Sequence, residues 1–132
     1  MVTYELRQDF VEIVNSNIKL LGLKNIKVKN KNFYEDVDET GIDVATLDLP
    51  EPWNAIDSCS KALIQGGFIA SYSPSVPQVM DFVSAIRKNE GFVYIKTVEA
   101  IQREWEVEER KVRPKSKGIF HSGFLSFARK VA

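Results

Sequence analysis

The spacing of apolar residues divides the N-terminal part of the chain into a strand, a helix and a second strand. Residues 1–5 predict the end of a strand. Residues 7–22 carry apolar side chains at helical spacing, and Gly22 ends this pattern as a helix C-terminal glycine would. The members of this apolar face are Phe10, Ile13, Val14, Ile18 and Leu21. At 25–29 apolar residues alternate with lysines and asparagines, which predicts a short edge strand, since edge lysines discourage pairing with other chains.

The stretch 43–53 predicts a buried parallel strand followed by a stiff loop. Residues 43–49 form a short apolar run with β-branched members, and Pro50 and Pro52 end it. A strand covered on both faces of a parallel sheet has such a nearly continuous hydrophobic run. In open α/β sheets, ligands bind outside the carboxyl ends of the strands. The pattern therefore places Asp48 where a ligand is expected.

A helix, a strand and a second helix follow this loop. The first helix begins near Pro52 and is expected to end at Gly66-Gly67. It is expected to bury Ala55, Ile56, Cys59, Ala62 and Leu63. Residues 68–72 predict the next strand, and Ser75 and Gln78 have capping-box spacing at the start of the second helix. The expected apolar face of that helix consists of Val76, Val79, Met80, Val83 and Ile86.

The C-terminal part of the chain is rich in strand-forming residues. Residues 92 to about 107 and 119 to about 128 favour strands, and the charged connection 108–118 is too short for a crossover helix. The last two strands are therefore predicted to be antiparallel neighbours. The predicted order β-α-β-loop-β-α-β-α-β-β is typical of an α/β, doubly wound, mostly parallel sheet with an antiparallel C-terminal hairpin.

Composition narrows the class of protein. With 132 residues, 44% hydrophobic side chains and a net charge of zero, residues 1–132 are expected to form one domain that is not a general polyanion binder. Cys59 is the single cysteine, which excludes an intrachain disulfide. A signal peptide and an apolar run of membrane-spanning length are missing from the pattern, so we expect a cytoplasmic protein with no membrane partner. Zinc spacing, a Walker loop, a nucleophile elbow and GxGxxG are also missing, so hydrolase and nucleotide-triphosphatase functions have no support, and we expect no metal.

Polar residues fall at the carboxyl ends of three predicted parallel strands: Glu5, Asp48 and Tyr72. Two carboxylate oxygens match the two hydroxyl donors of a ribose, but taken alone the position of Glu5 more often indicates an acid at a helix N-terminus. Asp48 is separated from the next helix by prolines, which makes helix capping the poorer explanation for it. Tyr72 is suited equally to stacking on a base and to packing at a strand end. The three residues are expected to line one crevice.

Other polar and aromatic candidates have two interpretations each. Gln78 fits the capping box better than a ligand site, and Trp53 fits packing better than a binding surface. His121 is suited to a phosphate or base contact and equally to a structural hydrogen bond. Residues 110–117 hold five cations, including Arg113, and no acid. They form a solvated loop or a phosphate-contacting loop.

Several motifs in order carry a resemblance to a known family. They are Tyr4-Glu5-Leu6-Arg7-Gln8-Asp9-Phe10, Asp48-Leu49-Pro50-Glu51-Pro52-Trp53, Tyr72-Ser73-Pro74 with Gln78, Gln102-Arg103-Glu104-Trp105, Arg113-Pro114 and His121-Ser122-Gly123-Phe124-Leu125. Nearly end to end, the sequence resembles the tRNA (adenine-N1)-methyltransferases that modify the T-loop, especially their archaeal branch. The resemblance implies an S-adenosylmethionine-dependent class I methyltransferase with a Rossmann-like fold that acts on adenine 57 or 58 of tRNA, and that assembles as a homotetramer.

The resemblance also implies roles for individual residues. Glu5 matches the ribose-binding acid, Asn32 and Phe33 match the segment that contacts the cofactor adenine, and Asp48 matches the catalytic aspartate, which also borders the cofactor. Tyr72 matches an aromatic residue that holds the target base. The residues expected on the tRNA side are Pro50, Trp53, Tyr72, Gln78, His121 and Arg113.

The sequence departs from the family pattern in two ways. Asn32 stands where the family usually has an aspartate. The family's N-terminal β-rich domain and its first Rossmann strand, with a glycine-rich turn, are expected before Tyr4 and do not occur here. The first hypothesis is a C-terminal, truncated catalytic domain with weak or no activity alone, and the second is a non-catalytic tRNA-binding or assembly subunit.

Overall fold

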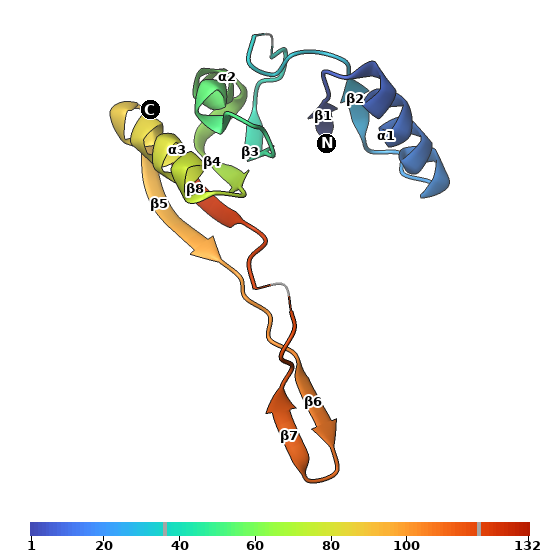
Figure 1. Ribbon diagram of the computed structural model, residues 1–132. Helices are drawn as coiled ribbons and strands as arrows, with labels where there is room; N and C mark the ends of the chain where they lie inside the picture. Colours follow the sequence, from blue (N-terminus) through green and yellow to red (C-terminus); the bar gives the residue numbers. More distant parts are fainter. Residues whose placement is uncertain (36, 119) are drawn as a thin grey trace.

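The chain folds into three parts that follow one another along the sequence (Figure 1). They are an N-terminal β-α-β unit, a four-stranded sheet with helices packed on one face, and a long hairpin that projects from the sheet. The computed structural model describes residues 1–35, 37–118 and 120–132. Positions 36 and 119, within the predicted loop and the start of the last predicted strand, lie outside the described residues. In the described part of the chain, none of the helices combines the length and apolar character that crossing a membrane requires.

The N-terminal unit consists of β1 (Val2–Tyr4), α1 (Gln8–Leu20) and β2 (Lys27–Lys29), which confirms the three elements predicted there. β1 and β2 pair in parallel. Gly22 has a positive φ of 65°, and its N–H donates to the Lys19 carbonyl at 3.2 Å while that of Leu23 donates to Ile18 at 3.0 Å. These two hydrogen bonds to the last helical turn explain why α1 ends at a glycine.

The main sheet has the strand order β3-β4-β8-β5. Its strands are β3 (Ile42–Leu47), β4 (Leu63–Ser73), β5 (Phe92–Glu99) and β8 (Phe124–Lys130). β3 and β4 are parallel, and β8 lies antiparallel between β4 and β5. The predicted antiparallel pairing of the last two long strands is confirmed.

Between β5 and β8 the chain forms a hairpin of β6 (Trp105–Glu108) and β7 (Lys111–Pro114). The expectation that 108–118 is only a connection was therefore wrong. Glu108 pairs with Lys111, and Glu109 adopts a positive φ of 46° in the tight turn between them. A tight turn of this kind lets the residues on its two sides pair as adjacent strands. The charged composition of the segment had suggested a loop instead.

Three helical segments cover one face of the sheet: η1 (Pro52–Ala55), α2 (Ile56–Ala62) and α3 (Val76–Lys88). The core between helices and sheet contains Leu47, Ala55, Ile56, Cys59, Leu63, Ile69, Phe82, Ile86, Phe92 and Ala128. The predicted burial of the apolar residues after Pro52 is confirmed, since Ala55, Ile56, Cys59, Ala62 and Leu63 are all buried. The predicted helix end at Gly66-Gly67 is wrong, because β4 begins at Leu63. Gly66, with φ +86°, lies where the β3–β4 register shifts, in a conformation that glycine adopts without strain.

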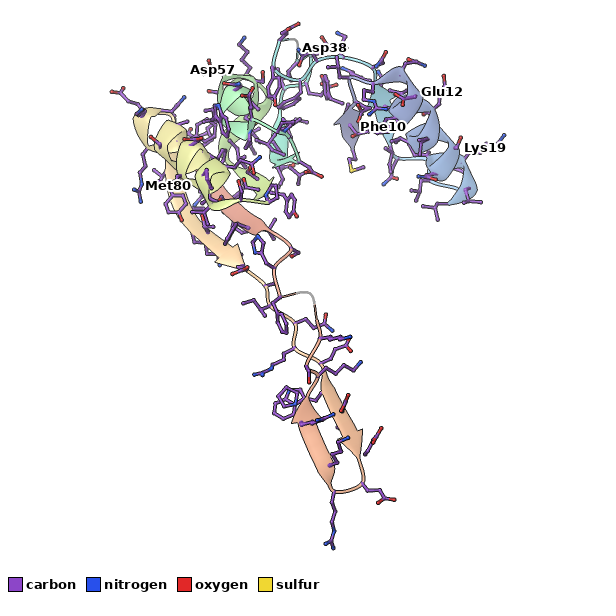
Figure 2. The ribbon with its side chains drawn as sticks, in the orientation of Figure 1. Phe10, Glu12, Lys19, Asp38, Asp57 and Met80 are labelled. Atoms are coloured by element: carbon purple, nitrogen blue, oxygen red, sulfur yellow. The ribbon has the colours of Figure 1, made fainter. Side chains whose placement is uncertain are left out.

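The buried face of α3 is offset from the predicted one. Phe82 and Ile86 are fully buried, whereas Val76 and Met80 are 56% and 65% exposed. Met80 lies on the outer side of the helix (Figure 2). Apolar spacing identifies a broad stripe on a helix, and the strands on which it docks select the part that is buried.

The opposite face of the sheet is left uncovered in the described residues. Val44, Phe68 and Leu125 are 53%, 38% and 41% exposed, and they alternate along their strands with residues that face the helices. β3 is therefore not buried on both faces, contrary to the sequence-based expectation. The apolar side of α1 is uncovered as well, with Ile13 54% and Leu20 83% exposed.

Candidate functional site

The carboxyl ends of β1 and β3 border one cavity. It measures about 470 Å³ and is lined by residues of both strands together with Phe33 and Leu49. Glu5 directly follows β1, and Asp48 directly follows β3. Glu5 is half-buried, whereas Asp48 is exposed. Glu5 and Asp48 thus each follow a strand that lines the cavity, but neither is among the residues that line it.

Glu5 joins the end of β1 to the start of α1. Its Oε1 accepts a hydrogen bond of 2.8 Å from the backbone N–H of Arg7, the N-cap residue of α1. Asn30 Nδ2 donates to the carbonyls of Glu5 and Leu6, both at 2.9 Å. In the described part of the chain Oε1 is the only carboxylate oxygen of Glu5 with a hydrogen bond, so Glu5 supports the helix start and presents its second oxygen.

Asn32 and Phe33 lie in the loop after β2. Asn32 Oδ1 accepts a 3.1 Å hydrogen bond from the N–H of Tyr34, which makes a side-chain turn typical of asparagine. Its oxygen is used in that turn. The Phe33 ring meets the Tyr4 ring edge-on, with centroids 5.3 Å apart, and lines the cavity. The aromatic ring, rather than the amide oxygen, is presented to the cavity.

An ionic clamp, which the sequence analysis missed, ties this loop to β1 and β2. Its members are Tyr4, Lys29, Lys31, Asp38 and Glu39. Lys29 Nζ lies 2.8 Å from Asp38 and also contacts Glu39, whose carboxylate accepts from the Tyr4 hydroxyl. The lysine bonds lower the pKa of Asp38 to about 2, and the Asp38 and Glu39 bonds raise that of Lys29. Figure 2 shows Asp38 on the segment that joins the N-terminal unit to the sheet.

The loop that carries Asp48 is held from α3. Gln78 Nε2 donates to the Pro50 carbonyl at 3.1 Å, and the Ser75 hydroxyl donates to Gln78 Oε1 at 2.7 Å. The Ser75 side chain does not cap α3, so the capping-box spacing joins two side chains instead. Trp53 is half-buried against the core and Pro52 is fully buried. The loop that carries Asp48 is thus fixed by the hydrogen bond from Gln78 to Pro50 and by the burial of Pro52.

Tyr72 is fixed near the end of β4 by the segment before β8. Its hydroxyl donates to the Ser122 carbonyl. A Cβ at Gly123 would overlap the Tyr72 ring, so this close approach requires glycine. A glycine next to a strand is the sequence signal that marks such an approach.

His121 has a partner on each ring nitrogen. Nδ1 bonds to Glu99, and Nε2 lies 2.9 Å from the Pro74 carbonyl. Both partners are acceptors, so the imidazolium form satisfies both. The Glu99 bond, followed by the Pro74 carbonyl, raises the pKa of His121. The structure places this side chain in a link between β5 and the β4–α3 turn.

Arg113 lies apart from the crevice. It is in β7, and its Nε donates to Glu106 of β6 at 2.9 Å. The hairpin that carries it projects well beyond the sheet (Figure 1). Two further cations of the 110–117 stretch, Lys111 and Lys115, lie on or directly after β7, and Lys115 contacts Glu104.

The comparison with solved structures assigns this α/β fold to the class I S-adenosylmethionine-dependent methyltransferases. Solved structures of this class superpose closely. An S-adenosylmethionine-dependent O-methyltransferase from Thermotoga maritima matches 99% of this chain and 49% of its own, with a TM-score of 0.92 and 31% identity. The tRNA (m1A58) methyltransferase TrmI from Aquifex aeolicus matches 99% and 53%, with a TM-score of 0.88 and 27% identity.

Residues 3–122 match the family described as tRNA methyltransferase complex GCD14 subunit, and the chain belongs to this family. A relative from Methanocaldococcus jannaschii, named tRNA (adenine(57)-N(1)/adenine(58)-N(1))-methyltransferase TrmI, is 33% identical over 98% of the chain and 55% of its own length. The chain spans about half the length of the curated relatives it matches and corresponds to their C-terminal part.

Proposed function

We propose that this chain is the C-terminal catalytic portion of a tRNA (adenine-N1)-methyltransferase that methylates adenine 57 or 58 in the T-loop. One observation carries the proposal. Asp48 stands on a braced loop at the carboxyl end of β3, between Leu47 and Leu49, which line the cavity together with Phe33. The identity to the M. jannaschii relative supports the choice of acceptor. We also propose that residues 1–132 belong to one catalytic domain of a cytoplasmic enzyme that requires no metal.

The residues at the cavity fit the nucleoside end of S-adenosylmethionine. Glu5 presents one carboxylate oxygen, which suits a ribose hydroxyl donor. Phe33 supplies an aromatic surface for a planar base, and Asn32 lies next to it. When bound, the cofactor supplies a methyl group on a sulfonium sulfur. Leu47 and Leu49 give the cavity an apolar wall on the β3 side, which keeps water from the reacting atoms.

Asp48 is proposed to stabilise the positive charge that develops on the target adenine and to accept its proton. With the cofactor bound, adenine N1 would take up the methyl group as the carbon–sulfur bond breaks and the sulfur leaves as a neutral thioether, so the positive charge would pass from the sulfur to the base. A fixed carboxylate stabilises that charge and then accepts a proton from N6. The brace from Gln78 to Pro50 holds the loop without a rearrangement during the reaction.

Tyr72 is the proposed landing surface for the target base. N1 lies on the pairing edge of adenine, so the base must leave its stack to react. The hydroxyl of Tyr72 donates to the Ser122 carbonyl, which fixes the position of the ring. Pro50 and Trp53 continue this surface along the Asp48 loop, and Gln78 acts on it through Pro50.

The wider tRNA contact is proposed to involve cationic groups away from the crevice. Arg113 and its neighbours on the projecting hairpin would contact phosphates that lie beyond the edge of the main sheet. His121 adds positive charge beside Tyr72 when it is protonated. The hairpin also exposes Trp105, Val107 and Val112 at 54%, 71% and 56%, which supports association of copies into a homo-oligomer, a tetramer by family resemblance.

The test of the catalytic assignment is Asp48→Ala in the complete enzyme. Methyl transfer from labelled S-adenosylmethionine to a T-loop tRNA transcript should fall by roughly 100-fold or more, as when a transition-state charge partner is lost. The tRNA dissociation constant should change by less than about threefold. Glu51→Ala is the matched control, since Glu51 is an exposed acid of the same loop whose hydrogen bonds, within the described residues, go to Asn54. Wild-type turnover in Asp48→Ala would remove Asp48 from the mechanism.

The alternative is a non-catalytic tRNA-binding or assembly subunit. Calorimetric titration of the 132-residue chain with S-adenosylmethionine separates the two. Binding in the micromolar range, about −8 kcal/mol, excludes a subunit that has lost cofactor affinity. Absence of binding at millimolar cofactor shows that this chain alone is not the enzyme. Nucleoside analysis of the product distinguishes N1-methyladenosine from an O-methylated product.

A further inference from the structure

Three consecutive residues before β8 hold the end of β4 and the turn that follows it. His121 Nε2 lies 2.9 Å from the Pro74 carbonyl, and the Ser122 carbonyl accepts a hydrogen bond from the Tyr72 hydroxyl. The backbone of Gly123 lies against the Tyr72 ring, where a Cβ would overlap it. The segment before β8 therefore contacts this turn on both sides.

A second set of hydrogen bonds leads from the turn to the loop that carries Asp48. The Ser75 hydroxyl donates to Gln78 Oε1 at 2.7 Å, and Gln78 Nε2 donates to the Pro50 carbonyl at 3.1 Å. Because Ser75 directly follows Pro74, a shift of the turn displaces the brace on the Asp48 loop. The proposed surface for the target base and the proposed catalytic loop thus depend on the same turn.

His121 also ties this turn to the base of the projecting hairpin. Its Nδ1 bonds to Glu99, the last residue of β5, where the chain leaves the sheet (Figure 1). Glu99 pairs with Phe124 at the start of β8, and the rings of His121 and Phe124 have centroids 4.9 Å apart. Among the described residues Glu99 supplies the charge that acts on His121, and Pro74 supplies a neutral acceptor. One imidazole therefore joins β5, β8 and the turn after β4.

The exposure of this imidazole indicates what its bonds contribute. The side chains of His121 and Glu99 are 46% and 29% exposed. Ion pairs with this access to water contribute little to stability, because the solvent screens them. In contrast, a displacement of about 1 Å near reacting groups can lower a rate by about 100-fold. The geometry that His121 imposes on the turn therefore matters more than the stability it adds.

We propose that His121 is a positioning residue for methyl transfer, which sets Tyr72 and the Asp48 loop by holding the Pro74 carbonyl. The bond from Nε2 to Pro74 carries this role, and the bond from Nδ1 to Glu99 orients the ring. The assignment rests on the proposed function. It goes beyond the positive charge that His121 adds beside the target base, because here the imidazole acts through the protein.

Two amide substitutions separate the bonds of His121 in the complete enzyme. The amide of His121→Gln takes the place of Nε2 and donates to Pro74, whereas the amide of His121→Asn takes the place of Nδ1 and bonds to Glu99. We expect kcat for methyl transfer to a T-loop tRNA transcript to fall at least about tenfold in His121→Asn and less than about threefold in His121→Gln. The KM for tRNA should stay within about twofold of the wild-type value in both.

Gln65→Ala is the matched control. Gln65 Nε2 also donates to a backbone carbonyl, that of Val131 at 3.2 Å, but near the opposite end of β4. Its loss should change kcat less than about twofold. Circular dichroism and thermal unfolding establish that all the variants are folded.

NMR spectra of the 132-residue chain add a measurement that does not depend on turnover. His121→Asn should shift the ring signals of Tyr72 and the side-chain amide signals of Gln78 further than His121→Gln does. Both variants lose the imidazole ring, but only His121→Asn loses the bond to Pro74, so the difference between them reports that bond.

Equal losses of kcat in the two amide variants overturn the proposal, as do identical Tyr72 and Gln78 signals. A raised KM for tRNA with an unchanged kcat also overturns it, since His121 would then contact tRNA directly. If the complete wild-type enzyme does not methylate the T-loop transcript, the proposed function fails. The NMR comparison then still decides whether His121 sets Tyr72 and the Asp48 loop, so the two failures are distinguishable.

Discussion

Helices α1 and α3 both contain 13 residues and are both amphipathic, yet they have very different surroundings. α3 packs on a sheet formed by its own chain and buries Phe82 and Ile86 completely. α1 buries only Val11 and leaves Ile13 and Leu20 largely exposed. An apolar stripe thus indicates that a helix needs a cover, but does not identify what covers it.

The difference extends to how each helix is held. Most helical stability in proteins comes from packing of the apolar face rather than from helix propensity. α3 has that packing on β4, β5 and β8. The unit that carries α1 relies on the parallel β1–β2 pair and on the ionic clamp around Lys29. Local and ionic contacts replace a hydrophobic core there.

The largest expected contrast is between two phenylalanine truncations. Phe82→Ala should lower the free energy of unfolding by about 3–5 kcal/mol, because it leaves a cavity in the core. Phe10→Ala on α1 should cost less than about 1 kcal/mol, since its ring is 40% exposed and packs under the Arg7 guanidinium. Denaturant unfolding measures both. Equal losses would show that the chain alone already covers α1.

A substitution at Gly123 tests the packed end of the sheet. Gly123→Ala should destabilise the chain by about 1–3 kcal/mol, because the added methyl displaces the Tyr72 ring from its bond to Ser122. Gly118→Ala is the control, since the nearest described atoms to its methyl would be those of the Phe120 ring, at 3.3 Å and beyond. Thermal unfolding and the NMR signals of Tyr72 report the change. Unaltered Tyr72 signals in Gly123→Ala would contradict the close approach.

Acid should loosen the N-terminal unit before it loosens α3. The pKa of Asp38 is lowered from 3.8 to about 2, so the stability it contributes is present above 3.8 and is lost as the pH falls through about 2. Amide exchange in β1 and β2 should accelerate over this range while Phe82 and Ile86 remain protected. Asp38→Asn should remove most of this dependence. Simultaneous loosening of both regions would reject an independent clamp.

The smallest expected effect is the titration of His121. Its pKa is raised above 6.5, so the contribution of its bonds is complete below 6.5 and is lost as the pH rises through the higher folded value. NMR titration of the imidazole should show a raised midpoint that Glu99→Gln moves back toward 6.5. The signals of α1 should not change in the same range. A midpoint unaffected by Glu99→Gln would exclude the Glu99 bond as the cause.

Local patterns predicted the order of the elements and the place of Asp48, because hydrophobic periodicity and terminating prolines act within a few residues. They did not predict the β6–β7 hairpin, where a tight turn at Glu109 pairs charged strands. They also misplaced the buried stripe of α3. The brace from Gln78 to Pro50 joins residues 28 positions apart, and no spacing rule reaches that far.

The sequence by itself determined an alternating α/β chain with acids at the ends of β1 and β3, since strand and helix periods are encoded locally. Only the tertiary structure decided that Glu5 supports α1, that Tyr72 is held by Ser122 from 50 residues away, and that β1 and β3 line one cavity. These features depend on which distant segments meet. Packing and strand pairing between segments far apart in the sequence determine these contacts after the local elements have formed.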